Sequence, residues 1–221
     1  MEATRPPVEL LEKNKPRQER AKRTYEAILE ATALLLIEVG VERISTNLIA
    51  EKAGITVPAV YRYFPNKYSV LHTLGAVLMD AQNRVCQEWF ERHLVRGDAL
   101  ALLNNVYELL ALTYQVTLKQ TGGLEILQCL RAVAPLQELR LQSHRLVAEQ
   151  FSKVLAELLR VPENETLALQ ARLSVDVGYA NVEMALEDRA YPADEILRQG
   201  AHMIGLYWQD VLDQNGNENS R

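Results

Sequence analysis

Apolar residues recur at helical spacing along almost the whole of this chain, and that spacing constrains its fold more than any other feature. Ile28, Ala31, Leu35 and Val39 fall at i, i+3, i+7 and i+11, which places them on one helix face. No segment alternates apolar and polar residues as a half-buried strand does. Glycine and proline punctuate the pattern, with Gly40 as a plausible stop for the first helix. We therefore expect an all-α fold of about nine helices, near residues 24–39, 46–53, 57–64, 67–93, 98–119, 124–134, 136–159, 167–187 and 194–212.

The composition is that of a soluble protein with enough apolar material for a core. Hydrophobic residues make up 48% and charged residues 24% of the 221 residues. No apolar stretch is long enough to span a bilayer, so we expect a cytoplasmic protein without a membrane partner. The two cysteines, Cys86 and Cys129, lie far apart without CxxC spacing, which argues against a disulfide scaffold or a zinc finger.

The charge is distributed unevenly along the chain. A net charge of −5 argues, taken alone, against a nucleic-acid binder. Residues 1–70, however, hold eleven Lys and Arg against nine Asp and Glu, and residues 13–25 hold six cations against Glu19 alone. Together with Pro6, Pro7 and Pro16, this pattern predicts a flexible basic arm over residues 1–19. The arm fits either a surface that binds a polyanion or a solvated tail.

Two short helices joined by a tight turn are expected within residues 45–64. The Thr46 hydroxyl could cap the first helix, and Gly54 could take the left-handed conformation that ends it. Thr56 could cap the second helix, with Pro58 in its first turn, where a missing N–H costs little. The turn alone fits either a helix-turn-helix or a helical corner inside a bundle.

The side chains of the second helix favour the helix-turn-helix. Helical spacing directs Val60 and Phe64 inward. The polar-tipped run Tyr61-Arg62-Tyr63 is unsuited to a core and suits contact with phosphates, and Lys67 adds a charge at the start of the next helix.

The segment at residues 20–70 resembles the TetR family of tetracycline-repressor-type regulators. Ile28, Ala31 and Leu35 followed by Gly40 resemble the family's first helix, and residues 46–55 resemble its second. The run Val60-Tyr61-Arg62-Tyr63-Phe64-Pro65-Asn66-Lys67 is similar to the family signature L-Y-x-H/Y-F-x-x-K. The resemblance implies an N-terminal three-helix bundle at residues 20–70 and a helical domain for ligand binding and dimerisation at residues 71–221.

The resemblance also implies which residues face DNA. The residues at the matching positions, with Arg62 as an additional reader, are Thr46, Thr56, Val57, Ala59, Tyr61, Arg62, Tyr63 and Lys67. Val57 and Ala59 depart from the polar members of the family, because they offer only apolar contacts, as to thymine methyl groups.

The function implied is a ligand-responsive repressor that binds a palindromic operator as a homodimer and releases it on binding a small apolar or amphipathic inducer. The alternative is a helical small-molecule-binding or scaffolding protein that retains the helix-turn-helix shape without operator binding. No nucleophile or phosphate-cradle motif occurs, the four histidines are dispersed, and we expect no enzyme activity, metal or cofactor.

Two further sites are expected in residues 71–221. Polar-tipped groups beside apolar stripes predict a ligand pocket near Tyr107, Tyr114, Cys129 and His144, although tyrosines at a core's edge are the alternative. The polar residues at 176, 181 and 183 could face an interface or a cavity. The last helix carries a broad apolar face, from which we expect a dimer interface that includes Met203, Tyr207, Trp208 and Val211.

Overall fold

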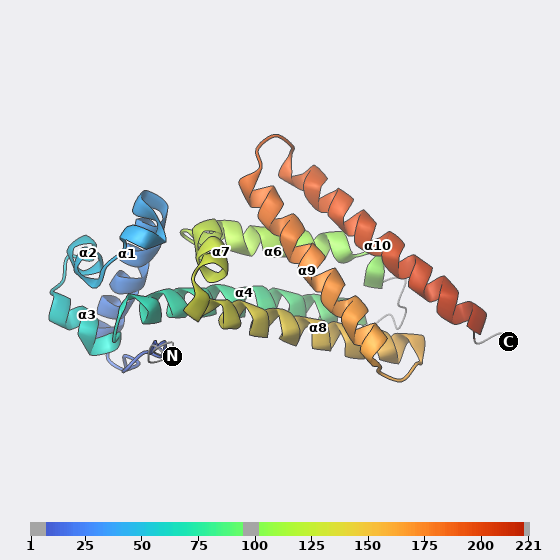
Figure 1. The fold of residues 1–221 in the computed structure, drawn as a ribbon, viewed down its shortest axis with the longest axis horizontal. Helices are drawn as coiled ribbons and strands as arrows, with labels where there is room; N and C mark the ends of the chain where they lie inside the picture. The colour runs from blue at the N-terminus through green and yellow to red at the C-terminus, as the bar shows by residue number, and fades with distance from the viewer. Residues whose placement is uncertain (1–7, 95–101, 219–221) are drawn as a thin grey trace, which may run out of the picture. The chain divides into compact units, whose positions relative to one another are not determined.

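The computed structural model describes residues 8–94 and 102–218, with side chains up to residue 214, and over these residues it contains helices and no strand (Figure 1). The expected all-α fold is confirmed. The helices followed through the described residues are α1 (Glu19–Arg43), α2 (Thr46–Lys52), α3 (Val57–Tyr63), α4 (Lys67–Leu94), α6 (Val106–Lys119), α7 (Gly123–Ala132), the 3-10 helix η1 (Ala134–Leu136), α8 (Gln137–Leu159), α9 (Glu165–Glu187) and α10 (Ala193–Glu218).

Most helix ends agree with the sequence pattern to within a few residues. The first helix starts five residues earlier than expected, at Glu19, and the last extends six residues further, to Glu218. Gly40 interrupts the helical dihedral angles of α1 at the expected stop, with φ +72° and ψ 162°. The expected start of a helix near residue 98 lies outside the described residues, and α6 begins at Val106. None of the described helices is both long and apolar enough to cross a membrane.

The chain divides into two compact units that differ from the contiguous domains expected. The first comprises residues up to 79 together with residues 119–141, and the second comprises residues 80–118 and 142 onward. The unit with α1–α3 therefore also contains α7 and η1. Close approaches explain this grouping: a Cβ added at Gly75 of α4 would lie 2.6 Å from a Leu130 methyl group of α7, and one at Gly122 would lie 3.0 Å from the Ala33 carbonyl oxygen. Such tertiary contacts leave no periodic signal in the sequence.

The first unit has a core that holds its three N-terminal helices together. Ile28 of α1, Ile49 of α2 and Val60 of α3 are all fully buried. Phe64, directly after α3, is also fully buried and stacks on Tyr25 of α1 with ring centroids 5.1 Å apart. These contacts fix the orientation of α2 and α3 on α1.

The second unit is built from the later part of α4 with α6, α8, α9 and α10. Trp89 of α4 and Trp208 of α10 are its largest fully buried side chains. The Trp208 indole N–H donates to Ser174 Oγ of α9 over 2.8 Å, so the buried donor is satisfied. Helices α9 and α10 pack closely at Gly200 of α10, where an added Cβ would lie 2.3 Å from the Asn181 side chain of α9.

Candidate nucleic-acid interface and apolar cavity

The start of α2 differs by one residue from the expected cap. Ser45 is the N-cap, and its hydroxyl accepts from the Leu48 backbone N–H over 3.2 Å. The expectation that Thr46 caps this helix is therefore wrong, because Thr46 is already the first helical residue. Its hydroxyl instead forms a 3.1 Å hydrogen bond with the hydroxyl of Tyr61 on α3. This bond joins the two short helices on their exposed side.

The turn between α2 and α3 has the expected geometry. Gly54 has φ +65°, the left-handed conformation that glycine adopts without strain. The next N–H, of Ile55, donates to the Ala50 carbonyl over 3.0 Å. Thr56 occupies the N-cap position of α3, and Pro58 lies in the first turn, but the exposed Thr56 hydroxyl makes no capping bond. The turn ends α2 and starts α3 within a few residues.

The side chains of α3 point inward and outward mostly as expected. Val60 and Phe64 are fully buried, whereas Tyr61 and Arg62 are exposed. Val57 and Ala59 are half-buried at the start of the helix. An exposed face with two apolar and two polar-tipped side chains thus lies on a firmly packed helix.

Tyr63 is not on that exposed face. Its side chain is only 4% exposed and packs edge-on against Tyr25, with ring centroids 5.8 Å apart. The expectation of an exposed phosphate contact at Tyr63 is therefore wrong, since the helix turns this ring toward α1. Lys67 is half-buried, and its ammonium group donates to the Val41 carbonyl over 3.3 Å. An ammonium group has three N–H donors, so this bond leaves donors for another acceptor.

The segment at residues 8–18 is packed on the first unit, which differs from the flexible arm expected. The Lys13 N–H donates to the Tyr63 carbonyl over 2.7 Å, and the Asn14 side chain donates to the Arg62 carbonyl over 3.0 Å. The Tyr25 hydroxyl donates to the Glu12 carboxylate. Burial, with the adjacent Glu12 carboxylate, raises the pKa of Tyr25 well above its usual range. The flexible arm was expected from charge and proline content, which carry no information about the backbone carbonyls of Arg62 and Tyr63 that hold this segment.

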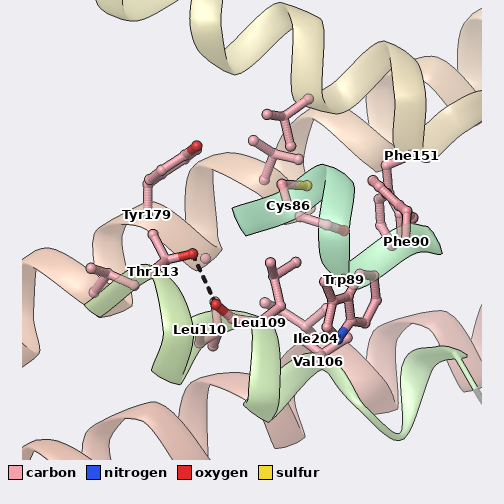
Figure 2. A pocket seen from close by; sticks show the side chains of 15 residues that line it. Cys86, Trp89, Phe90, Val106, Leu109, Leu110, Thr113, Phe151, Tyr179 and Ile204 are labelled. Atoms are coloured by element: carbon pink, nitrogen blue, oxygen red, sulfur yellow. Dashed lines mark hydrogen bonds between the residues drawn. The ribbon is translucent and has the colours of Figure 1, made fainter. Parts of the chain in front are cut away.

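An apolar cavity lies within the second unit (Figure 2). Its volume is about 60 Å³, and none of its lining side chains is charged. Two of the lining hydroxyls donate to backbone carbonyls: Thr113 Oγ1 donates to that of Leu109 over 2.8 Å, and Ser174 Oγ donates to that of Gln170 over 2.9 Å. The lining residues are Cys86, Trp89, Phe90, Val106, Leu109, Leu110, Thr113, Val147, Phe151, Ser174, Val175, Gly178, Tyr179, Val182 and Ile204.

None of the four residues expected at a ligand pocket lines this cavity. Tyr107 donates through its hydroxyl to Asp194 at the surface, and Tyr114 is half-buried at the edge of the core. Cys129 packs in α7 of the other unit, where burial raises the pKa of its thiol to about 11. His144 is buried but does not line the cavity. Its ring stacks on that of Tyr179, a lining residue, with ring centroids 4.1 Å apart.

Most of the lining residues belong to ordinary apolar stripes, so the sequence pattern does not mark them as a ligand site. Cys86, Trp89 and Phe90 follow one another along α4 at core positions. The available signal was the segment at residues 175–182, which mixes small, apolar and polar residues. Gly178 and Tyr179 of this segment lie at the cavity, whereas Asp176 forms a 2.7 Å hydrogen bond with His144 Nδ1.

The expected interface residues of α10 fall on two different sides of the helix. Trp208 and Val211 are buried in their own subunit, so their assignment to a dimer interface is wrong. Met203 and Tyr207 are exposed, at 63% and 39%, because they lie outside the buried stripe of α10. Other large apolar side chains exposed on α9 and α10 are Leu169, Leu173, Val177, Met184 and Leu206.

Comparison with known proteins identifies the N-terminal segment. Residues 28–74 match the sequence profile of the bacterial regulatory proteins of the tetR family. The tetracycline repressor protein class C of Escherichia coli is 35% identical over 79 residues, which cover 34% of this chain and 35% of that repressor. The matched segment thus spans about a third of the repressor's length.

Solved structures match most of the chain in fold. A protein from Pseudomonas aeruginosa PAO1 superposes with a TM-score of 0.70 at 16% identity, covering 89% of this chain and 93% of that one. A TetR-family transcriptional regulator from Streptomyces coelicolor superposes with a TM-score of 0.56 at 22% identity, covering 85% and 99%. Residues 28–74 are therefore similar in sequence to the tetR family of bacterial regulatory proteins, and most of the chain shares its fold with TetR-family regulators of known structure.

Proposed function

We propose that this protein is a ligand-responsive transcriptional repressor that binds a palindromic operator as a homodimer. The observation that carries the proposal is the exposed face of α3, held on a buried core and tied to α2 by the bond between Thr46 and Tyr61. A helix of this kind fits the major groove of B-DNA. Tyr61 and Arg62 would reach base edges or phosphates, and Val57 and Ala59 would meet thymine methyl groups.

Contacts with phosphates would fix the helix in the groove. Thr46 and Thr56 offer hydroxyls at the starts of α2 and α3, and Lys67 offers its remaining ammonium donors. Such contacts orient a protein on the duplex but carry no sequence information. Specificity would therefore depend on the few side chains at the start and middle of α3.

The exposed apolar side chains of α9 and α10 support self-association. On α9, Leu169, Leu173 and Val177 are spaced by four residues, so they lie on one face. On α10, Met203 and Leu206 are more than half exposed. A twofold dimer formed through these helices would carry two copies of α3 and would read two half-sites related by symmetry.

The cavity supports a small uncharged ligand, apolar or amphipathic. A buried ion without a partner is costly, and this lining offers none. At about 60 Å³ the cavity is far smaller than the roughly 300–1,000 Å³ typical of ligand pockets. Binding would therefore have to move lining side chains or helices. A ligand that prefers the widened state would shift the population toward it, and α4, which carries both Lys67 and Trp89, is the candidate link to DNA release.

The test is DNA binding followed by fluorescence anisotropy, with duplexes from the region upstream of the protein's own reading frame. Tyr61→Ala should weaken binding to the preferred duplex by roughly five- to 150-fold, since a base contact contributes about 1–3 kcal/mol. Its effect on a scrambled duplex should be smaller. Tyr191→Ala, which removes an exposed tyrosine from the second unit, is the matched control and should bind like wild type. If wild type prefers no duplex, the protein is better described as a helical small-molecule-binding or scaffolding protein.

A further inference from the structure

The segment that precedes α1 is held against the end of α3. Its Lys13 N–H and Asn14 side chain donate to the carbonyls of Tyr63 and Arg62, in the last turn of that helix. Carbonyls in the last turn lack partners within their own helix, so the segment satisfies acceptors that would otherwise need water. A third bond, from the Asn66 side chain to the Glu9 carbonyl over 2.9 Å, fixes the segment further upstream. The segment passes beside α3 before α1 begins (Figure 1).

A groove with a cationic lining lies between this segment and α3. Lys13, Lys15, Arg17 and Arg62 contribute to its lining, which contains no carboxylate. Within the described part of the chain, Lys15 alone among these four lies within 4.0 Å of a carboxylate, that of Glu12 at 3.4 Å. The Lys15 side chain is 85% exposed, whereas that of Glu12 is 17% exposed and accepts from Tyr25. The Glu12 carboxylate is thus largely buried, whereas the four cations are exposed.

We propose that residues 13–18 form a second DNA-contacting element, a cationic clamp on the phosphodiester backbone beside the bases that α3 would read. The inference rests on the proposed function. Arg62 belongs both to α3 and to the groove, so the positive surface continues from the reading helix onto the segment. A duplex carries one charge per about 1.7 Å of its axis, so its regular array of phosphates can contact several of these cations together. Pro16, half-buried in the groove, limits the backbone freedom that DNA binding would otherwise have to remove.

This clamp would replace the phosphate contact that Tyr63 cannot make. The Tyr63 ring is turned toward Tyr25, but its carbonyl holds Lys13 of the clamp. Tyr63 would therefore contribute to DNA binding through its backbone carbonyl, which holds residues 13–18 in place.

The experiment uses the full-length protein and a random-sequence 30-base-pair duplex, with affinity measured by anisotropy at several salt concentrations between 50 and 200 mM. The variant Lys15→Ala/Arg17→Ala should lower the slope of log affinity against log salt by about 1.8 for each bound subunit, since each phosphate contact contributes about 0.9. Lys153→Ala/Arg189→Ala removes two exposed cations from the second unit and should keep the wild-type slope. Circular dichroism should show wild-type helicity for both, because all four side chains are exposed.

A second variant tests the docked position separately from the charge. Asn14→Ala keeps every cation but removes the bond to the Arg62 carbonyl, so affinity should fall several-fold at an unchanged slope. A wild-type slope in Lys15→Ala/Arg17→Ala, or wild-type affinity in Asn14→Ala, would overturn the clamp while leaving operator binding by α3 intact. If the wild-type protein binds no duplex at all, the proposed function itself fails.

Discussion

Replacing Ser174 by alanine should destabilise the protein through a group that the substitution does not touch. Trp208 is fully buried, and its indole N–H has Ser174 Oγ as its acceptor at 2.8 Å. Ser174→Ala removes that acceptor where water has little access, since Ser174 is itself only 7% exposed. A buried donor left without a partner costs about 1–3 kcal/mol. We therefore expect the free energy of unfolding to fall by about 2 kcal/mol.

A double-mutant cycle isolates this effect from other consequences of the substitution. Trp208→Phe removes the indole N–H and leaves the bond from Ser174 to the Gln170 carbonyl in place. In the Trp208→Phe background, Ser174→Ala leaves no buried donor without an acceptor, so it should change the free energy of unfolding by less than about 1 kcal/mol. The coupling energy between the two substitutions should then be about 1–2 kcal/mol.

The assay is guanidinium unfolding followed by ellipticity at 222 nm, because a fluorescence signal would change with the tryptophan itself. All four proteins are compared at one protomer concentration, since association makes apparent stability depend on concentration. An equal cost of Ser174→Ala in both backgrounds would show that the indole is not bonded within its own subunit.

Three further outcomes follow from the structure. Gly54→Ala should lower stability by about 1 kcal/mol and Gly54→Asn by less, because φ is +65° and asparagine tolerates this conformation better than alanine; equal melting temperatures for all three would contradict a left-handed conformation at this position. Met203→Glu with Leu206→Glu should give monomers in sedimentation and lose operator affinity, and an intact dimer would exclude this face as the interface. The Cys86 thiol should resist iodoacetamide at pH 8 in the folded protein, since burial raises its pKa to about 12. Rapid alkylation, detected by mass spectrometry, would show that the cavity opens readily.

The helix boundaries were predictable because local chemistry determines them. Gly54 ends α2, Pro58 starts α3, and the apolar spacing of Ile28, Ala31 and Leu35 marks the buried face of α1. Each signal depends on residues within a few positions of one another. The same locality explains the error at the start of α2. Ser45 and Thr46 both carry hydroxyls, and only the extended backbone of Ser45, with φ −136° and ψ 159°, decides between them.

The candidate sites were less predictable because they depend on which helices meet. Tyr63 has a polar tip on a short exposed helix, yet the position of Tyr25 on α1 buries it. None of the residues expected at the pocket lines the cavity, which is formed where apolar stripes of α4, α6, α8, α9 and α10 fail to fill space completely. A void of this kind is a property of packing, and no residue type marks it in the sequence.

The residues of α10 illustrate the same difficulty for assembly. Met203, Tyr207, Trp208 and Val211 are all apolar or aromatic, and their spacing alone fits one broad face. In the folded subunit two of them fill the core and two remain exposed, because α10 packs against α9 along one side only. A helix that packs on its own core and also contacts a partner subunit carries apolar residues on both faces. The sequence pattern then no longer distinguishes the buried face from the exposed one. This is why substitutions meant to separate subunits must be chosen from exposure. A glutamate at Val211 would disrupt the subunit itself, whereas glutamates at Met203 and Leu206 leave its core intact and act only on what covers that face.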